Sequence, residues 1–307
     1  MSRQYHSFTS PLRYPGGKGA LSNFMKLLVS QNGLLDGHYV EVYAGGAAVA
    51  WSLLFEEYVQ HVHINDIDTT VCAFWNSVLE RTDDICRMIH DTRVTIQAWK
   101  RQKAVLAHPE DHSPLQLGFA AFFLNRTNRS GIISGGVIGG KAQDGKWKLD
   151  ARFNKHDLIA RIVRIAGYAD RITVYNLDAV NFIGHLLPAF PPRSLLYLDP
   201  PYYVKGGGLY EHHYTHQDHA TIARIVSRLG DYAWVVSYDA APEILRLYGR
   251  FRCVRYDLSY SAQDRYSGSE VIFLSPKLKL PAVSHPARVT SVQVRHASVT
   301  PATPLSA

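Results

Sequence analysis

The fold is decided by Leu195-Leu196-Tyr197-Leu198-Asp199-Pro200-Pro201-Tyr202-Tyr203, an apolar run that stops at two prolines. Such a run, bounded by residues that break strands, predicts a buried parallel strand. Asp199 then lies at the carboxyl end of that strand, where open α/β sheets bind their ligands. We therefore expect an α/β fold with a ligand site at this point.

The chemistry of this strand end favours a planar amine. Proline fixes φ and donates no hydrogen bond, so the Asp199 carboxylate and the Pro200 carbonyl are acceptors in a rigid turn. Two acceptors suit an exocyclic amino group, and the ring of Tyr202 suits stacking on a base. Such acceptors would stabilise positive charge on the nitrogen during attack. The alternative is a strand-end turn with a capping aspartate.

The composition suits one large globular domain, or a domain with an insertion. The chain has 307 residues, of which 46% are hydrophobic and 19% are charged. A formal charge of +7 and a pI of about 9.2 favour a polyanionic partner. Cys72, Cys86 and Cys253 lack disulfide or metal spacing, which is typical of a reducing compartment. Because we find neither a signal peptide nor a run of ~18 apolar residues, we expect a cytoplasmic protein without a membrane segment.

Two further segments place a glycine turn before a helix. In Leu12-Arg13-Tyr14-Pro15-Gly16-Gly17-Lys18, the turn exposes backbone N–H groups and brings Tyr14 and Lys18 towards a ligand. A tight turn with a solvated lysine is the alternative. Between Tyr39 and Trp51, small residues around Gly45 let the backbone approach a cofactor. Since the three spaced glycines of the dinucleotide fingerprint are missing, a purely structural turn stays open.

Two acidic residues follow neighbouring predicted strands. Asp66 lies about 20 residues after the glycine turn, where an acidic side chain accepts hydrogen bonds from ribose hydroxyls. Asp178 could accept from the adenine amino group of a cofactor, or cap the helix that begins at Ala179. We predict no metal site, because His61 and His63 are typical edge residues and the histidines at 212–219 lack a suitable partner.

From residue 82 onwards the character of the chain changes. Residues 93–155 contain 11 Lys or Arg and 4 Asp or Glu, an excess equal to the formal charge of the whole chain. An apolar helix runs into Asn, Arg and Gly, and a Gly-rich basic stretch, Ser134 to Lys148, follows. Arginine and lysine neutralise phosphates, and Arg and Asn also read base edges, so we predict an inserted nucleic-acid-reading subdomain. The alternative is a solvated face with a mobile loop. The candidate DNA contacts are Asn125, Arg126, Asn128, Arg129 and Lys141.

In this order the motifs resemble those of the Dam-like DNA adenine-N6 methyltransferases, which use S-adenosylmethionine. The resemblance runs from about Leu12 to Leu274. It implies a Rossmann-like sheet with helices on both faces, an inserted, mainly helical recognition subdomain, and double-stranded DNA as the substrate. The motifs are Pro15-Gly16-Gly17-Lys18, Val42-Tyr43-Ala44-Gly45-Gly46, Asn65-Asp66-Ile67-Asp68, Asn76, Phe122-Phe123-Leu124-Asn125-Arg126 and Asp199-Pro200-Pro201-Tyr202.

The resemblance also implies residue roles. Asp199 and the Pro200 carbonyl would hold the adenine N6 amine, and Tyr202 would stack on the extruded base. Asn125 and Arg126 would contact DNA. The residues that would line the cofactor are Tyr14, Lys18, Tyr43, Gly45, Asp66, Asp178 and Asp199.

Domain boundaries follow from these assignments. We expect residues 11–81 and 156–275 to form the methyltransferase catalytic domain and 82–155 the recognition subdomain. Residues 276–307 are predicted to be a disordered tail, because they are rich in Pro, Ser, Thr, Ala and Val and contain no acidic residue. Val204 to Gly208 is a candidate lid over the site.

The chain departs from the family pattern at two points. Ala47-Ala48 replaces a further glycine or serine of the cofactor turn, and Thr127 to Gly131 replaces an aromatic-Asn-Gly element, which leaves the target sequence open. RNA or a protein glutamine is an alternative methyl acceptor, and a non-catalytic DNA-binding module is an alternative of another class. A cognate restriction endonuclease is a candidate partner, and we expect a monomer or weak dimer.

Overall fold

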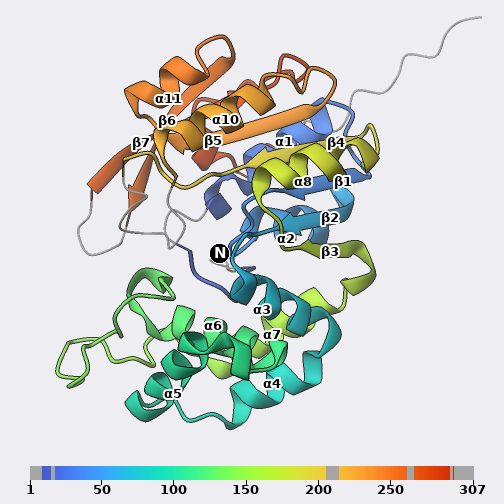
Figure 1. Cartoon of the computed structure of the whole chain (residues 1–307). Coiled ribbons are helices and arrows are strands. Elements are labelled where there is room, and N and C mark those ends of the chain that lie inside the picture. Colours follow the sequence, from blue (N-terminus) through green and yellow to red (C-terminus); the bar gives the residue numbers. More distant parts are fainter. Residues whose placement is uncertain (1–8, 15–17, 205–213, 261–265, 291–292, 294–307) are drawn as a thin grey trace, which may run out of the picture.

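A parallel sheet with an antiparallel edge organises the molecule (Figure 1). The computed structural model describes residues 9–14, 18–204, 214–260, 266–290 and 293, and within them the sheet has seven strands in the order β3-β2-β1-β4-β5-β7-β6. β7 runs antiparallel to its neighbours β5 and β6, and the other pairs are parallel. This arrangement confirms the predicted Rossmann-like α/β fold. The strands are β1 (Gly37–Glu41), β2 (Val59–Asn65), β3 (Ile172–Tyr175), β4 (Ser194–Leu198), β5 (Ala233–Asp239), β6 (Arg252–Tyr260) and β7 (Tyr266–Leu274).

The predicted central strand lies in the middle of the sheet. All five residues of β4 are buried, and β4 pairs with β1 on one side and β5 on the other. Such a strand is apolar throughout because both of its faces are covered. The strand order reverses between β1 and β4, and at such a reversal the loops at the carboxyl ends diverge and leave room for a ligand. Asp199 therefore lies at the switch point of the sheet.

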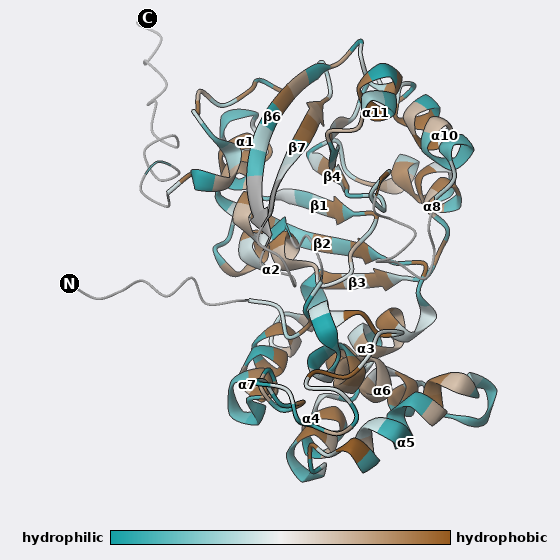
Figure 2. Ribbon diagram, turned by 90° about the vertical axis from the view of Figure 1, so that its left-hand side faces the viewer, coloured by the Kyte–Doolittle hydropathy of each residue, from teal (hydrophilic) through white to brown (hydrophobic). Residues whose placement is uncertain are grey.

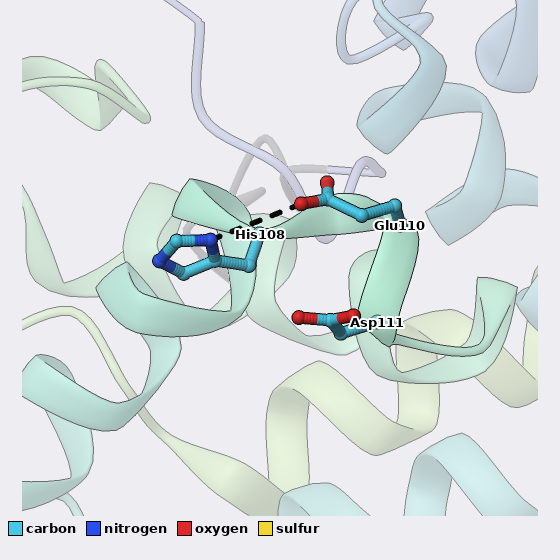
Figure 3. Close-up of side chains that lie close together, drawn as sticks. All are labelled: His108, Glu110 and Asp111. Atoms are coloured by element: carbon cyan, nitrogen blue, oxygen red, sulfur yellow. Dashed lines mark ion pairs between the residues drawn. The ribbon is translucent and has the colours of Figure 1, made fainter.

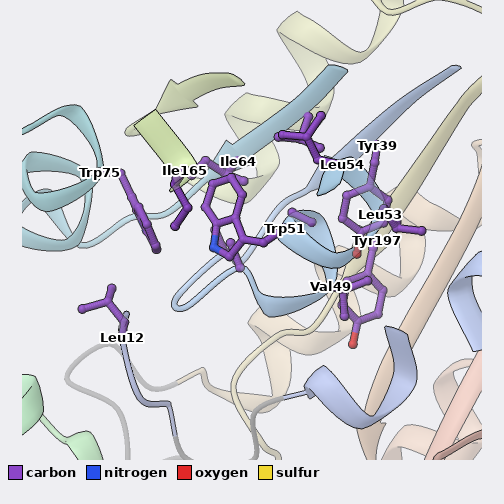
Figure 4. Packing of buried hydrophobic residues seen from close by; sticks show 14 of the residues in the cluster. Leu12, Tyr39, Val49, Trp51, Leu53, Leu54, Ile64, Trp75, Ile165 and Tyr197 are labelled. Carbon is purple, nitrogen blue, oxygen red and sulfur yellow. The ribbon is translucent and has the colours of Figure 1, made fainter. Parts of the chain in front are cut away.

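Helices cover both faces of the sheet. One face packs against α1 (Ser22–Gln31) and α2 (Ala48–Phe55), in a cluster that includes Trp51, Tyr39 and Tyr197 (Figure 4). The other face packs against α8 (Ala179–Leu186), α10 (His216–Val226) and α11 (Pro242–Leu247). Alternate residues of β1 enter the two clusters, since successive strand side chains point to opposite faces.

A helical part adjoins the β3 end of the sheet (Figure 1). Its core is α6, which begins with a capping box formed by Ser113 and Gln116 and is buried from Leu117 to its end. α6 packs so closely on α3 that a Cβ at Gly118 would lie 2.6 Å from the Ala73 carbonyl oxygen. The predicted helical character is confirmed up to Thr127, while the boundaries of the subdomain stay predictions. The helices are α3 (Thr69–Glu80), α4 (Thr82–Asp91), α5 (Ile96–Ala107), α6 (Pro114–Thr127) and α7 (Lys155–Ala166).

The prediction of a disordered tail from residue 276 is wrong for residues 276–290. This segment, here called the strap, packs across α1, with Leu278 and Val289 buried in the core. The Asn32 side chain donates to the Lys279 carbonyl and accepts from the Lys279 amide. The sequence suggested disorder because the tail is rich in Pro, Ser, Thr, Ala and Val and contains no acidic residue. Its few apolar residues, among them Leu278 and Val289, are nevertheless buried in the core.

Several helices are amphipathic, as the hydrophilic and hydrophobic bands on α5 and α10 illustrate (Figure 2), whereas α2 and most of α6 are buried. None of the helices in the described ranges combines the length and apolar character that a bilayer-spanning segment needs.

Candidate active site

A buried charge cluster lies beside the end of β4. The ammonium group of Lys18, at the start of η1 (Lys18–Leu21), is 2.8 Å from Asp199 Oδ1 and 3.4 Å from Glu270 Oε2. Ser237 on β5 donates its hydroxyl to Asp199 Oδ1 at 2.6 Å. Four segments that are far apart in the sequence thus meet at Asp199: η1, β4, β5 and β7.

One hydrogen-bond acceptor site of the Asp199 carboxylate is not used by any described residue. An ionised carboxylate offers about four lone-pair sites. Lys18 and Ser237 use two sites on Oδ1, and Lys18 also donates to Oδ2 at 3.1 Å. The Asp199 side chain is 23% exposed, so the remaining site on Oδ2 can meet an incoming N–H group.

Lys18 stays charged despite its burial. Burial disfavours the ammonium form, but the carboxylates of Asp199 and Glu270 outweigh it and hold the pKa of Lys18 well above its usual value. Conversely, burial raises the pKa of Glu270, although Lys18 opposes this shift. Because Lys18 and Ser237 both donate to its carboxylate, Asp199 is a hydrogen-bond acceptor held in a fixed position.

A further acidic side chain lies on the same face of the sheet. Glu41, at the end of β1, is buried, and its Oε2 has no hydrogen-bond partner among the described residues. Burial, and then the charge of Asp199, raise the pKa of Glu41 well above its usual value. Both causes favour the protonated form of Glu41.

The turn after β4 is held by a second carboxylate. Asp239 accepts hydrogen bonds from the amides of Tyr203 and Val204, at 2.9 and 3.0 Å. Tyr202 donates its hydroxyl to Glu270 at 2.7 Å, and Lys18 lies 4.9 Å from the centre of its ring. The ring of Tyr202 is mostly buried, so its stacking on a base stays a prediction. The candidate lid, from residue 205 onwards, lies outside the described residues.

The glycine turn after β1 meets the acidic residue after β2. The amide of Gly45 donates to Asp66 Oδ2 at 2.8 Å. Gly45 has a φ of +45°, and a Cβ there would lie 2.8 Å from the ring of Tyr14. Glycine is therefore required by both backbone conformation and space. The turn brings together three of the predicted cofactor residues: Tyr14, Gly45 and Asp66.

The neighbouring acid, Asp178, caps α8. Its carboxylate accepts from the amides of Val180 and Asn181, which is the capping role predicted as one of two alternatives. Ile67, Leu177 and Val180 expose apolar side chains beside Asp66 and Asp178. Asn176 ties the two loops together, since its side chain donates to the Asp66 and Ile67 carbonyls. An apolar rim between two carboxylates fits an adenosine group, whose ring needs an apolar surface and whose hydroxyl and amino groups need acceptors.

Tyr43 lies farther towards α10, where its hydroxyl is 3.0 Å from that of Tyr214. Its cofactor contact stays a prediction. The Pro15-Gly16-Gly17 turn lies outside the described residues.

The predicted DNA-binding residues divide into buried and exposed groups. Asn125 is fully buried and holds both the amide and the carbonyl of Arg13, as well as the Gly131 carbonyl. Asn128 is fully buried and bonds Trp99 and the Ile132 and Ile133 carbonyls. This geometry does not support a direct DNA contact by either asparagine.

Arg126 is also buried, and its guanidinium donates to the Arg152 carbonyl at 2.9 Å. Burial, reinforced by Arg13, lowers the pKa of Arg126 to about 9. Arg129 and Lys141 are exposed. The DNA contacts of these three residues stay predictions.

His38 on β1 and His61 and His63 on β2 form a stack, and both strands have a neighbour on each side, so the expectation that His61 and His63 are edge residues is wrong. His38 Nδ1 lies 2.9 Å from His63 Nε2, and the rings of His61 and His63 are 4.6 Å apart. Burial lowers the pKa of His63 to about 3, so the stack is neutral. Among the described residues, His108, Glu110 and Asp111 could together approach one cation, but all three are exposed on a short turn (Figure 3).

Sequence reasoning missed Glu270, Ser237 and Glu41 as site residues. Glu41 and Ser237 are polar residues near the carboxyl ends of the parallel strands β1 and β5. Glu270 lies on antiparallel β7, opposite Asp239 at the end of β5. An unexplained polar residue at such a position is a signal that could have found them.

Comparisons with known proteins agree with this geometry. Residues 14–261 match the family model of the D12 class of N6 adenine-specific DNA methyltransferases. A comparison with curated proteins found no match.

Among solved structures, a Pyrococcus horikoshii protein proposed to be an RNA methyltransferase is 11% identical, with a TM-score of 0.39, over 86% of this chain and 85% of that chain. An rRNA methyltransferase from Streptomyces viridochromogenes is 13% identical, with a TM-score of 0.35, over 83% of this chain and 82% of that chain. TrmK of M. capricolum, in complex with S-adenosyl-homocysteine, is 8% identical, with a TM-score of 0.34, over 86% of this chain and 73% of that chain.

Proposed function

Because the chain belongs to the D12 class of N6 adenine-specific DNA methyltransferases, we propose that Asp199 and the Pro200 carbonyl hold the N6 amine of an adenine turned out of duplex DNA. S-adenosylmethionine is the cofactor of this reaction. The proposal is supported above all by the open acceptor site on Asp199 Oδ2, because one carboxylate oxygen and one carbonyl match the two N–H donors of the amine.

We propose that Tyr14, Gly45, Asp66 and Asp178 hold the cofactor. They lie around one edge of the sheet, and the exposed apolar rim between the two aspartates fits the adenine ring. When bound, S-adenosylmethionine supplies an electrophilic methyl group on a sulfonium centre.

The residues of the chain then contribute positioning and electrostatics. Asp199 and the Pro200 carbonyl orient the N6 amine and stabilise the positive charge that develops on its nitrogen. Lys18 and Ser237 fix the Asp199 carboxylate, and Asp239 fixes the backbone that follows Pro200.

The basic insertion supports duplex DNA as the substrate. We propose that Arg129 and Lys141, which are exposed, contact DNA, and that Asn125 and Asn128 shape the loop that carries Arg129. A restriction endonuclease partner and a monomeric or weakly dimeric state stay predictions.

The test is methyl transfer by an Asp199→Ala variant. With labelled S-adenosylmethionine, we expect this variant to lose transfer to DNA while its DNA affinity stays within about threefold of wild type. Asp231→Ala, which changes an exposed aspartate, is the matched control. Wild-type turnover by the Asp199 variant would remove the tetrapeptide from the mechanism. Offering DNA, RNA and protein in parallel decides the acceptor, and calorimetry with the cofactor tests the non-catalytic alternative.

A further inference from the structure

The loop between Ile138 and Asp150 is built around one side chain. Gln143 donates to the carbonyls of Ile138 and Gly140, at 2.7 and 2.6 Å, and accepts from the amide of Leu149 at 2.9 Å. Three residues of this loop have a left-handed backbone: Gly139, Gly140 and Gln143. A loop with this many internal bonds, and with one non-glycine residue, Gln143, held at a positive φ, has a defined shape.

This shape directs a tryptophan outwards. Trp147 is 64% exposed, whereas Trp51, Trp75, Trp99 and Trp234 are buried. The backbone of the loop is closely packed at this point, because a Cβ at Gly139 would lie 2.5 Å from the Trp147 carbonyl oxygen. A large aromatic side chain that a fixed loop holds outside is available for contact with a partner.

The surroundings of Trp147 favour nucleic acid over protein as that partner. The ammonium group of Lys146 lies 5.9 Å from the centre of the indole ring, and Lys141 and Lys148 are exposed on the same loop. Within the described ranges, the other exposed large apolar side chains lie on other segments. A single aromatic ring among lysines resembles the stacking positions of nucleic-acid-binding surfaces, whereas a protein interface would present a contiguous apolar patch.

We propose that Trp147 is a DNA contact that stacks its indole ring on a base of the bound substrate, while the lysines around it neutralise the neighbouring phosphates. This inference rests on the proposed function. The loop projects on the same side of the molecule as β6 and β7, on the left in Figure 1, so DNA in contact with the loop can extend towards them. The unstacked base that Trp147 needs is available when a neighbouring adenine has turned out.

The experiment compares Trp147→Ala, Trp147→Phe and Lys141→Ala, with sheared bacterial DNA that lacks N6-methyladenine as the probe. Loss of a stacking contact should raise the Kd of Trp147→Ala about tenfold, and Trp147→Phe should retain most of the affinity. The slope of log Kd against log salt should stay unchanged in Trp147→Ala but fall by about 1 in Lys141→Ala, because only the lysine displaces counterions. At saturating DNA, we expect methyl transfer by Trp147→Ala to stay within about threefold of wild type.

Fluorescence reports the contact directly. Because the other four tryptophans are buried, acrylamide should quench mainly Trp147, and bound DNA should protect it. The inference is overturned if wild-type protein binds and methylates the DNA while Trp147→Ala keeps the wild-type Kd, or if DNA leaves the quenching unchanged. Failure of the wild-type protein to methylate the DNA at all would instead overturn the proposed function, and the inference with it.

Discussion

Glu270→Gln is the substitution that best tests the charge cluster. Glu270 is 1% exposed and has three partners in the cluster: Lys18 at 3.4 Å, and the hydroxyls of Tyr202 and Tyr256 at 2.7 and 3.2 Å. Glutamine has nearly the same shape, so it changes the charge without leaving a cavity. Its oxygen can still accept from Tyr202, but its amide group would point a donor towards Lys18.

The size of the effect follows from these contacts. A hydrogen bond to a charged group contributes about 1.5–3 kcal/mol and a neutral one about 1 kcal/mol, so replacing the carboxylate should cost roughly 2 kcal/mol. We expect this loss to let Lys18 and Tyr202 shift from the geometry that orients Asp199. A rise of roughly 2 kcal/mol in the activation free energy lowers kcat about 30-fold, because each 1.36 kcal/mol is a factor of about ten. We expect the KM for S-adenosylmethionine and the Kd for DNA to stay within about twofold of wild type.

The assay is labelled methyl transfer as a function of pH. Burial raises the pKa of Glu270, and its ionised form is the one that pairs with Lys18. Wild-type kcat should therefore rise as pH rises through that pKa, and this acidic limb should disappear in Glu270→Gln. Tyr256→Phe is the matched control, because it removes one bond to Glu270 and leaves the charge, and we expect a loss of less than about threefold.

Two results would refute this reasoning. One is a Glu270→Gln enzyme with wild-type kcat and an unchanged acidic limb. The other is a lowered melting temperature with no change in kcat, which would limit Glu270 to holding the fold together.

Three further substitutions test separate features. Glu41→Gln should gain stability relative to wild type in urea unfolding as pH rises above the usual pKa of a glutamate. The raised pKa of Glu41 makes wild-type stability fall as pH rises, whereas glutamine does not titrate. A pH-independent difference would contradict this. Leu278→Ala should lower the free energy of unfolding by about 2–4 kcal/mol, since Leu278 is buried in the strap, whereas a disordered tail would give no change. Asn125→Ala should lower the free energy of unfolding by roughly 3 kcal/mol, because it leaves buried backbone groups unpaired. Arg129→Ala should keep the free energy of unfolding within about 0.5 kcal/mol of wild type, and should reduce the slope of log Kd for DNA against log salt by about 1. Equal effects of the last two on DNA binding would contradict the division into buried and exposed residues.

Sequence reasoning was strongest where a local pattern has one physical interpretation. The apolar run before Asp199 could only be a strand covered on both faces, and the structure places it between β1 and β5. It was weaker where one residue type serves two purposes. Asn125 stands in a basic region, where asparagine suggests base reading, yet an asparagine at the end of a buried helix equally suits the bonding of loop backbone. The strap was misjudged because composition alone does not show which apolar residues find a partner in the core.

The sequence by itself determined the sheet, the position of Asp199 at the end of a central strand, and the family, because strand periodicity and ordered motifs are local properties of the chain. Only the tertiary structure decided that Lys18 and Asp199, separated by 181 positions, pair with each other and with Glu270, that Asn125 points inwards, and that Trp147 points outwards. The physical reason is that a charge buried in a protein must find a partner in space, and which partner it finds depends on the order of the strands and not on spacing along the chain.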